Sequence, residues 1–338
     1  MTAAPAPAAR SAATPAPALS LDGHDVVPFA FVLAAAHQRG LLAALERGAA
    51  DAAALTATLG LDARAAALAL ELLVSFGIAE RRSDGGYALG PALREAARLV
   101  PGGLANDLAV WSHLSGFLTH GDPVTDMDGG TDRRAALYAG VAAGLGQMWA
   151  GAAGQLAVAL AGHGPRVLDV GCGSGVWSLA LAAARPDCTV TGVDLPPVLP
   201  AFEERARAVG AAGRARPLGG DAHAIQLADA SFDVVIVANL LRLESPPRAA
   251  ALLARLAPAL APGGQLVVVD ALAGGTPAAE RRRAVYALHL GLRTRQGGVH
   301  TPADVRRWLA AAGLEDAEAI DLGDTPGAEA AIRAWRRP

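Results

Sequence analysis

The sequence contains no lysine, so every basic side chain apart from histidine is arginine, and a mechanism that forms a Schiff base on lysine is excluded. Only two cysteines, Cys172 and Cys188, are present, which argues against a disulfide framework and favours a reducing compartment. No run approaches the roughly 18 apolar residues that a membrane helix requires. These absences predict a soluble, cytoplasmic protein without a membrane partner.

The first twenty residues are rich in alanine and proline, and Arg10 is their only charged side chain. Four prolines interrupt the apolar stretch that a signal peptide needs, so we expect residues 1–20 to be a disordered tail. Over the whole chain, 52% of the residues are hydrophobic, enough for the cores of two domains. A formal charge of −3 and a pI near 6.2 argue against a nucleic-acid-binding surface.

The most informative segment is an apolar strand, Arg166–Val170, that runs into a glycine-rich turn and then a helix-like stretch, Val176–Ala184. Gly171, Gly173 and Gly175 alternate in an Asp-x-Gly-x-Gly-x-Gly pattern. Glycine permits positive φ and close approach of a ligand, and the first N–H groups of the helix have no partner within it. The pattern predicts a nucleotide-type cofactor site at the carboxyl end of a parallel strand.

Further strand-like segments follow, as in an alternating α/β fold. Thr189–Val193 ends in Asp194, where an acidic group can accept hydrogen bonds from both ribose hydroxyls. A third segment ends in Gly220-Asp221-Ala222, where a carboxylate can meet an adenine amino group. The remaining expected strands are Phe232–Ala238, Gln265–Asp270 (after the turn Pro262–Gly264), Leu314–Ile320 and Ala328–Trp335. The pattern predicts a Rossmann-like, mostly parallel, doubly wound sheet.

The N-terminal part predicts helices followed by a hairpin. Helices are expected over 24–48 with a break at Gly40, over Asp51–Leu59 and over Asp62–Phe76, the last two beginning at N-capping aspartates. Ile78–Arg82 and Tyr87–Leu89 should pair around an Asp-Gly-Gly turn. This is the order of a winged helix, which often binds DNA. Residues 21–100, however, carry nine acidic and seven basic side chains, a balance that gives phosphate no net attraction.

In order and spacing, five segments resemble class I S-adenosylmethionine-dependent methyltransferases: Leu168–Gly175, Gly192–Asp194, Gly220–Ala222, Phe232–Asp233 and Leu260–Gly264. Over residues 24–336 the chain is similar to small-molecule O-methyltransferases of the plant caffeate type and their bacterial secondary-metabolism relatives. The resemblance implies a homodimer and S-adenosyl-L-methionine as cofactor. It divides the chain into a mainly helical winged-helix dimerisation domain (21–100), a helical linker and substrate lid (101–162) and a cofactor-binding catalytic domain (163–338).

The resemblance also implies roles for the residues of the cofactor motifs. Asp169 would support the glycine loop near the methionine end, Asp194 would hold the ribose, and Asp221 the adenine edge. The alternatives are a helix-capping carboxylate for Asp194 and an ordinary turn aspartate for Asp221. The predicted cofactor-binding residues are Asp169, Gly171, Gly173, Gly175, Asp194, Leu195, Asp221 and Ala222.

The catalytic pattern of that family is absent. A His followed by an Asp after the fourth strand removes the acceptor proton in the plant-type enzymes. In the matching stretch, Asn239–Ser245, those positions hold Arg242 and Leu243, and the family's supporting glutamate is matched by Val299 or His300. Arginine stays protonated, so it cannot be the general base, although it can bind a carboxylate or phenolate or stabilise developing negative charge.

Three interpretations of this substitution stay open. The acceptor needs little base, as an amine or electron-rich carbon would; or another group is the base, with His289 and His300 as leading candidates; or the cofactor is bound without methyl transfer. His289 can instead be a histidine satisfied by a backbone carbonyl, and His300 a cap of the helix that starts at Thr301. Tyr286 and Arg295 are further pocket candidates.

We therefore predict a methyltransferase that acts on a small aromatic or polyketide-like secondary metabolite at oxygen, carbon or nitrogen. The candidate catalytic residues are Arg242, His289 and His300, and no metal site is expected because no cluster of ligands is evident. The first alternative is a cofactor-binding enzyme that catalyses a non-methylating reaction such as decarboxylation or hydroxylation. The second is a winged-helix regulator that senses the cofactor and binds duplex DNA.

Overall fold

The structure is a computed structural model that describes residues 23–48, 51–99, 103–128, 130–272, 276–323, 325 and 329–338. The tail expected over residues 1–20 lies outside the described residues. The chain forms two compact units, one on either side of the bond between Glu95 and Ala96.

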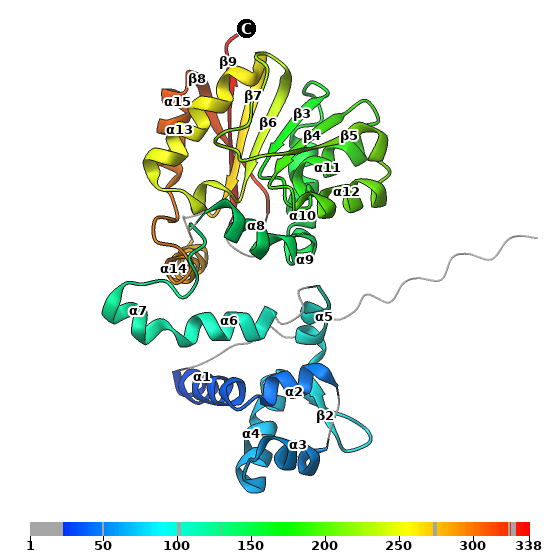
Figure 1. Cartoon of the computed structure of the whole chain (residues 1–338), viewed down its shortest axis with the longest axis vertical. Helices are drawn as coiled ribbons and strands as arrows, with labels where there is room; N and C mark the ends of the chain where they lie inside the picture. Colours follow the sequence, from blue (N-terminus) through cyan, green and yellow to red (C-terminus); the bar gives the residue numbers. More distant parts are fainter. Residues whose placement is uncertain are drawn as a thin grey trace, which may run out of the picture. The chain divides into compact units, whose positions relative to one another are not determined.

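The first unit consists of helices followed by a two-stranded hairpin. Its elements are α1 (Gly23–Gln38), α2 (Leu41–Arg47), α3 (Ala52–Leu59), α4 (Ala63–Ser75), β1 (Ala79–Arg81) and β2 (Tyr87–Leu89), followed by α5 (Pro91–Leu99) (Figure 1). The expected break between the first two helices occurs at Gly40, whose φ is 74°. Asp51 and Asp62 cap α3 and α4 as expected, each accepting a hydrogen bond from the N–H group three residues later.

The hairpin of the first unit is held to the helices by a polar contact. β1 and β2 are antiparallel, with Ala79 opposite Leu89. The Tyr87 hydroxyl donates to Glu71 Oε1 of α4 at 2.7 Å. Leu70 and Leu73 of the same helix are fully buried. The helix–helix–hairpin order of a winged-helix unit is therefore present.

Within the described parts of the chain, no single helix is long and apolar enough to cross a membrane. Only together would α1 and α2 be long and apolar enough for a span, and these two helices are bent by 70° relative to each other.

The second unit is built on a seven-stranded sheet. The strands are β3 (Arg166–Val170), β4 (Thr189–Asp194), β5 (Ala215–Gly219), β6 (Phe232–Ala238), β7 (Leu260–Asp270), β8 (Leu314–Ile320) and β9 (Ala330–Arg336), in the order β5-β4-β3-β6-β7-β9-β8. β3 to β7 are parallel, and β9 is antiparallel to both of its neighbours. This arrangement confirms the predicted mostly parallel sheet and its final strand pair; the expected start at Ala328 lies outside the described residues.

Helices cover both faces of this sheet (Figure 1). α10 (Ala150–Ala159), α11 (Val176–Ala184) and α12 (Leu199–Ala208) pack on one face, and α13 (Pro246–Leu256) and α15 (Pro302–Ala311) on the other. Successive side chains of a strand point to opposite faces, so Ile236 of β6 joins the first core and Val237 the second. The remaining elements are α6 (Gly103–Ser112), α7 (Leu114–His120), α8 (Thr131–Ala139), α9 (Ala142–Met148), α14 (Pro277–Gly291) and the short 3-10 turns Ala212–Arg214, Leu241–Leu243 and Ala257–Ala259.

β7 begins earlier than the sequence suggests. The Pro262–Gly264 segment was expected to be a turn that leads into a strand at Gln265, but the strand already pairs with β6 at Leu260. The register shifts between this pair and Gln265, and Gly263 has a φ of 73°. Between the pairs Phe232–Leu260 and Val234–Gln265, β6 advances two residues and β7 five, so β7 carries three extra residues here. Extra residues that bend a strand without ending it form a bulge, so the expected turn is an irregularity inside β7.

Gly192 of β4 allows the Phe202 ring of α12 to pack directly on the strand. An added Cβ would lie 2.5 Å from this ring, which is fully buried. We expect Gly192→Ala to lower the free energy of unfolding by about 1–3 kcal/mol, because the ring must move within a packed core. Urea denaturation measures this. Gly213→Ala is the control, since an added Cβ there meets nothing within 4 Å. Equal urea midpoints for the two variants would contradict the close packing.

Candidate functional site

The segments that follow β3, β4 and β5 are joined by main-chain hydrogen bonds at the carboxyl edge of the sheet. The N–H groups of Gly171 and Cys172 donate to the Val193 carbonyl at 2.8 and 3.0 Å. The Gly220 N–H group donates to the Asp194 carbonyl at 2.9 Å. Parallel strands bring their carboxyl ends to one edge, which is where open α/β sheets bind ligands. The three predicted cofactor motifs therefore lie next to one another.

The glycine loop between β3 and α11 requires glycine for two reasons. Gly171, Gly173 and Gly175 all have positive φ, at 71°, 53° and 68°. An added Cβ on Gly175 would lie 2.5 Å from the Phe202 ring, whereas around Gly173 nothing lies within 4 Å of such an atom. The loop is thus packed at its end and open at its centre, where a ligand can approach the backbone.

Asp194, at the end of β4, holds this loop in place. Its Oδ2 accepts a hydrogen bond from the Gly173 N–H group and its Oδ1 one from the Leu195 N–H group, both at 2.7 Å. Burial raises the pKa of Asp194, and the two N–H groups oppose that rise. Each carboxylate oxygen has a second lone pair, so both can accept a further donor such as a ribose hydroxyl. Asp194 does not cap the following helix, since α12 begins at Leu199 and its N-cap residue is Val198, with no side-chain capping bond.

Asp169 lies beneath the loop with one oxygen unpartnered. Its side chain is almost fully buried, and its Oδ2 accepts a hydrogen bond from the Ser178 hydroxyl of α11 at 2.5 Å. Burial raises its pKa to about 7. Its Oδ1 has no hydrogen-bond partner within the described residues. A buried acceptor without a donor is costly, and a bound donor group would satisfy it.

Asp221 follows β5 in a turn of its own. Its Oδ1 accepts a hydrogen bond from the His223 N–H group at 2.9 Å, as in an ordinary turn aspartate, and both Asp221 and Ala222 are half-buried. The contacts of this region fit a ribose-containing cofactor: acceptor positions on Asp194, the orphaned oxygen of Asp169 and the open backbone at Gly173. Those residues would hold it.

Arg242 is a buried cation at the position where the related family carries its base. Its side chain is 9% exposed. The guanidinium lies 3.6 Å from Asp270 Oδ1 and 3.8 Å from Glu329 Oε1, distances that are longer than hydrogen bonds. Its Cζ is 4.9 Å from the centre of the Tyr286 ring and 5.9 Å from that of Trp149. Burial lowers the pKa of Arg242, but the nearby tyrosine and carboxylates outweigh this and raise it. The side chain therefore stays charged.

The surroundings of Arg242 are fixed by neighbouring elements. The Arg242 backbone N–H group donates to Asp270 Oδ2 at 3.1 Å, and the Trp149 indole N–H donates to Glu329 Oε1 at 3.0 Å. Tyr286 of α14 and Tyr138 of α8 pack on one small apolar cluster. Burial raises the pKa of both phenols. A cation flanked by aromatic rings has the chemistry to bind a flat molecule that carries a negative oxygen.

His289 lies one helical turn along α14 from Tyr286. Its ring stacks on Trp111, with the centroids 5.4 Å apart and the planes at 11°. Its Nε2 is 3.6 Å from Asp107 Oδ1, too far for a hydrogen bond. Burial, together with the charge of Arg293, lowers its pKa to about 4. At neutral pH the ring is uncharged, and it is a weak proton acceptor.

His300 is held inside the protein. It is buried, its Nε2 lies 3.0 Å from the Leu241 carbonyl oxygen, and its ring meets Trp308 edge-on. The helix after it is capped by Thr301 in a capping box with Asp304, so His300 is not the cap. Of the other pocket candidates, Tyr286 contacts Arg242, whereas Arg295 forms an exposed ion pair with Asp122.

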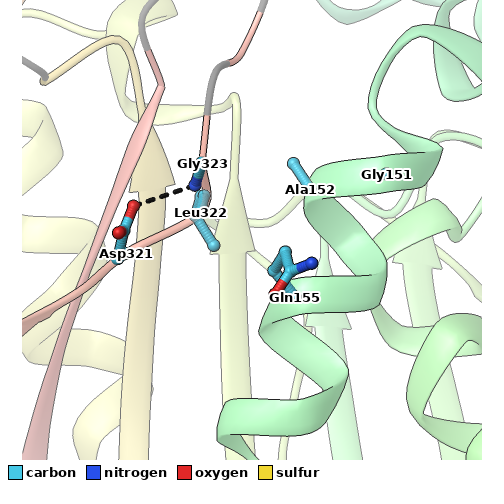
Figure 2. Close-up of a pocket in the computed structure, with 6 residues that line it drawn as sticks. All are labelled: Gly151, Ala152, Gln155, Asp321, Leu322 and Gly323. Carbon is cyan, nitrogen blue, oxygen red and sulfur yellow. Dashed lines mark hydrogen bonds between the residues drawn. The ribbon is translucent and has the colours of Figure 1, made fainter.

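A cleft lies at the same edge of the sheet, since β8 runs parallel to β7. Its lining residues are Gly151, Ala152 and Gln155 of α10 and Asp321, Leu322 and Gly323 after β8. Figure 2 shows the helix on one side of the cleft and the loop on the other, with the Asp321 carboxylate accepting a hydrogen bond from the Gly323 N–H group. No predicted site residue lines this cleft. Across the described residues, no three His, Cys, Asp or Glu side chains are placed to hold a metal ion.

Sequence reasoning missed several residues around Arg242. Asp270 ends β7, so the rule that sites gather at the carboxyl ends of parallel strands could have identified it. Glu329 and Trp149 come from segments 180 residues apart, and no local pattern joins them. Glu244 carries no recognisable motif either, yet its buried carboxylate contacts three basic side chains.

Comparison with known proteins agrees with this geometry. Residues 167–264 match the methyltransferase domain family. The chain is 29% identical to the tetracenomycin polyketide synthesis 8-O-methyl transferase of Streptomyces glaucescens, with 76% of this chain and 79% of the relative covered. It is 28% identical to the 3-hydroxy-5-methyl-1-naphthoate 3-O-methyltransferase of Streptomyces sahachiroi, with 89% of this chain and 90% of the relative covered.

A solved structure extends the match to nearly the full length. The apo form of the S-adenosylmethionine-dependent methyltransferase SibL is 27% identical with a TM-score of 0.59, covering 93% of this chain and 99% of that one. The glycine loop, the carboxylates at the strand ends and the methyltransferase domain all lead to one assignment. The chain is an S-adenosylmethionine-dependent methyltransferase, and it is similar in sequence and fold to the small-molecule O-methyltransferases.

Proposed function

We propose that this enzyme methylates a phenol- or enol-type aromatic, polyketide-like secondary metabolite, and that Arg242 binds the negative oxygen of the acceptor. The single observation that carries the proposal is the buried Arg242 guanidinium, which lies 3.6 Å from Asp270 and 3.8 Å from Glu329, beyond hydrogen-bond distance from either of these described carboxylates. A cation at this position favours a phenolate or enolate over a protonated amine. The anion spreads its charge over oxygen and carbon, so either atom can accept the methyl group, and nitrogen is disfavoured.

The positions of His289 and His300 support a mechanism in which neither histidine acts as the base. His300 is already paired with a backbone carbonyl, and the lowered pKa of His289 makes it a poor base for a phenol. An acceptor that is ionised beside Arg242 needs no strong base, because the cation lowers the pKa of the bound hydroxyl. His289 and Trp111 then serve as an aromatic wall. The name of the first relative describes O-methylation in the synthesis of the polyketide tetracenomycin, and that of the second describes O-methylation of a hydroxynaphthoate.

Methyl transfer requires alignment and charge compensation from the protein. S-adenosylmethionine, when bound, supplies a methyl group on a positively charged sulfur. Asp194 would hold the ribose hydroxyls and Asp169 a donor at the methionine end, with Leu195, Asp221 and Ala222 around the adenine. Arg242 would hold the acceptor oxygen against Tyr286 and Trp149 in line with that methyl group. Fixing both partners supplies much of the rate increase in such displacements.

The finer points of organisation belong to the same proposal. The unit over 21–100 would pair two protomers into a homodimer, residues 101–162 would cover the substrate, and 163–338 would carry the catalytic site. We place the enzyme in the cytoplasm, acting on a small molecule without a nucleic-acid or membrane partner. The low cysteine content and the balance of acidic and basic side chains in the first unit support these assignments.

The substrate class is tested with methyl-labelled S-adenosylmethionine and a panel of phenols, enols, indoles, amines and keto acids. We expect label in phenolic or enolic aromatics, with product mass increased by one methyl group. Mass spectrometry and NMR would distinguish oxygen from carbon as the acceptor. Exclusive labelling of amines, or conversion of a substrate without added mass, would overturn the proposal.

Removing the cation should shift the pH dependence of turnover. Arg242→Gln raises the pKa of the bound acceptor, so the ascending alkaline limb of kcat is expected to move up by about one pH unit or more, the equivalent of roughly 1.4 kcal/mol. The pH–rate profiles of wild type, Arg242→Gln and His289→Phe measure this. We expect the ascending limb of kcat in His289→Phe to lie at the same pH as in the wild type. If instead His289→Phe alone abolishes the limb, His289 is the base and Arg242 has another role.

Asp194 should determine cofactor affinity. Asp194→Ala removes charge-assisted hydrogen bonds worth about 1.5–3 kcal/mol each, so we expect the Kd for S-adenosylmethionine to rise at least about tenfold. Isothermal titration calorimetry measures the change. The exposed Asp187→Asn, at a site paired with Arg185 on the surface, is the control and should bind as wild type does. Unchanged affinity in Asp194→Ala would refute the assignment.

A further inference from the structure

Glu244 is a buried carboxylate that contacts basic side chains from three segments. Its side chain is only 2% exposed. Oε1 lies 3.2 Å from Arg134 Nη1 and 3.2 Å from His223 Nε2, and Oε2 accepts a hydrogen bond from Arg248 Nε at 2.6 Å. Burial raises the pKa of Glu244, but these contacts outweigh it and lower the pKa to about 2. The carboxylate therefore stays charged at every working pH.

The three segments that meet at Glu244 all belong to the cofactor side of the site. His223 lies two residues after Asp221, and its N–H group donates a hydrogen bond to the Asp221 carboxylate. Arg248 lies on α13, and its charge acts on Asp221 as well. Arg134 lies on α8, and its charge acts on Asp194. Glu244 therefore contacts three elements: the turn that contains Asp221 and His223, the helix α13 and the helix α8.

α8 is the element of this group that is least fixed by other contacts. Of its residues only Ala135 is buried. Its closest polar contacts outside the helix are made by Arg134, which also approaches the Met127 carbonyl at 3.4 Å, while the exposed Arg133 lies 3.9 Å from Asp126 Oδ2. The same helix carries Tyr138, which packs on the same apolar cluster as Tyr286 and is affected by the charge of Arg242. Figure 1 shows α8 at the end of the sheet opposite the C-terminus of the chain, the end that carries the cofactor loops. The position of α8 therefore affects both halves of the site.

We propose that the Arg134–Glu244 ion pair is a latch that holds α8 closed over bound S-adenosylmethionine, and that both are positioning residues for the cofactor. The pair joins a helix with little burial to a carboxylate fixed from two other sides. A closed α8 slows cofactor release and keeps Tyr138 beside the acceptor. The latch acts through geometry and makes no contact with the reacting atoms.

The experiment compares two arginines that share Glu244. Arg134→Gln breaks the contact to α8, whereas Arg248→Gln breaks a contact of similar type on α13, where the side chain is 53% exposed. S-adenosylmethionine dissociation is followed by stopped-flow tryptophan fluorescence of the full chain, and Kd by calorimetry. We expect Arg134→Gln to release the cofactor at least about fivefold faster, the lower end of usual coupling effects, with an unchanged Tm of the free protein. Arg248→Gln should stay within about twofold of wild type.

A double-mutant cycle separates the latch from a direct effect of the Arg134 charge on Asp194. If the arginine acts through Glu244, Arg134→Gln adds no further acceleration in a Glu244→Gln background. Persistence of the full effect in that background would overturn the latch, as would equal release rates in wild type and Arg134→Gln. Hydrogen exchange of the cofactor-bound single variants gives an independent readout should Glu244→Gln fold poorly. Residues 131–139 should exchange faster in Arg134→Gln than in Arg248→Gln, and equal exchange would also refute the proposal.

Discussion

The hydrogen bonds between the ends of β3 and β4 are the interaction on which the rest of the site depends. The Val193 carbonyl accepts from two consecutive N–H groups of the glycine loop, and the Asp194 carboxylate accepts from a third at Gly173. These contacts form only because parallel strands end at one edge of the sheet, and because glycine lets the loop turn back on the neighbouring strand. Without them, the open backbone at the centre of the loop and the acceptor oxygens of Asp194 would not face the same space.

The chemistry proposed for the acceptor side rests on a cation, Arg242, at the position where the family pattern has a base. A buried guanidinium is costly unless anions and aromatic rings surround it, and Asp270, Glu329, Tyr286 and Trp149 supply that environment. The carboxylates lie near enough to stabilise the charge and too far to occupy the N–H groups as hydrogen-bond acceptors. Such a cation lowers the pKa of an acidic hydroxyl and aligns it. The proposed mechanism differs from proton removal by histidine, and it would require an acceptor that ionises readily.

The two halves of the site are linked through short helices with little burial. α8 carries Arg134, which contacts Glu244, and Tyr138, which packs on the same apolar cluster as Tyr286, so under the proposal its position would affect the binding of both reactants. Enzymes of this kind have to admit and release a large cofactor in each cycle, and elements with few buried contacts open at the lowest cost. A charged pair at the end of such a helix gives the closed position a defined geometry, while the sheet beneath it stays fixed by its apolar core.

The sequence by itself determined the parallel sheet, the glycine loop and the acidic residues at the strand ends, because strand periodicity, glycine spacing and N-capping aspartates are local patterns. It also identified Arg242 as a departure from the family. It placed the start of β7 too late, since a bulge at Gly263 and a turn use the same residues. Only the tertiary structure decided which groups surround Arg242 and that His300 is paired with the Leu241 carbonyl. Glu329, Trp149, Glu244 and Arg134 are brought together by folding from distant segments, and contacts across such distances leave no pattern in a single chain.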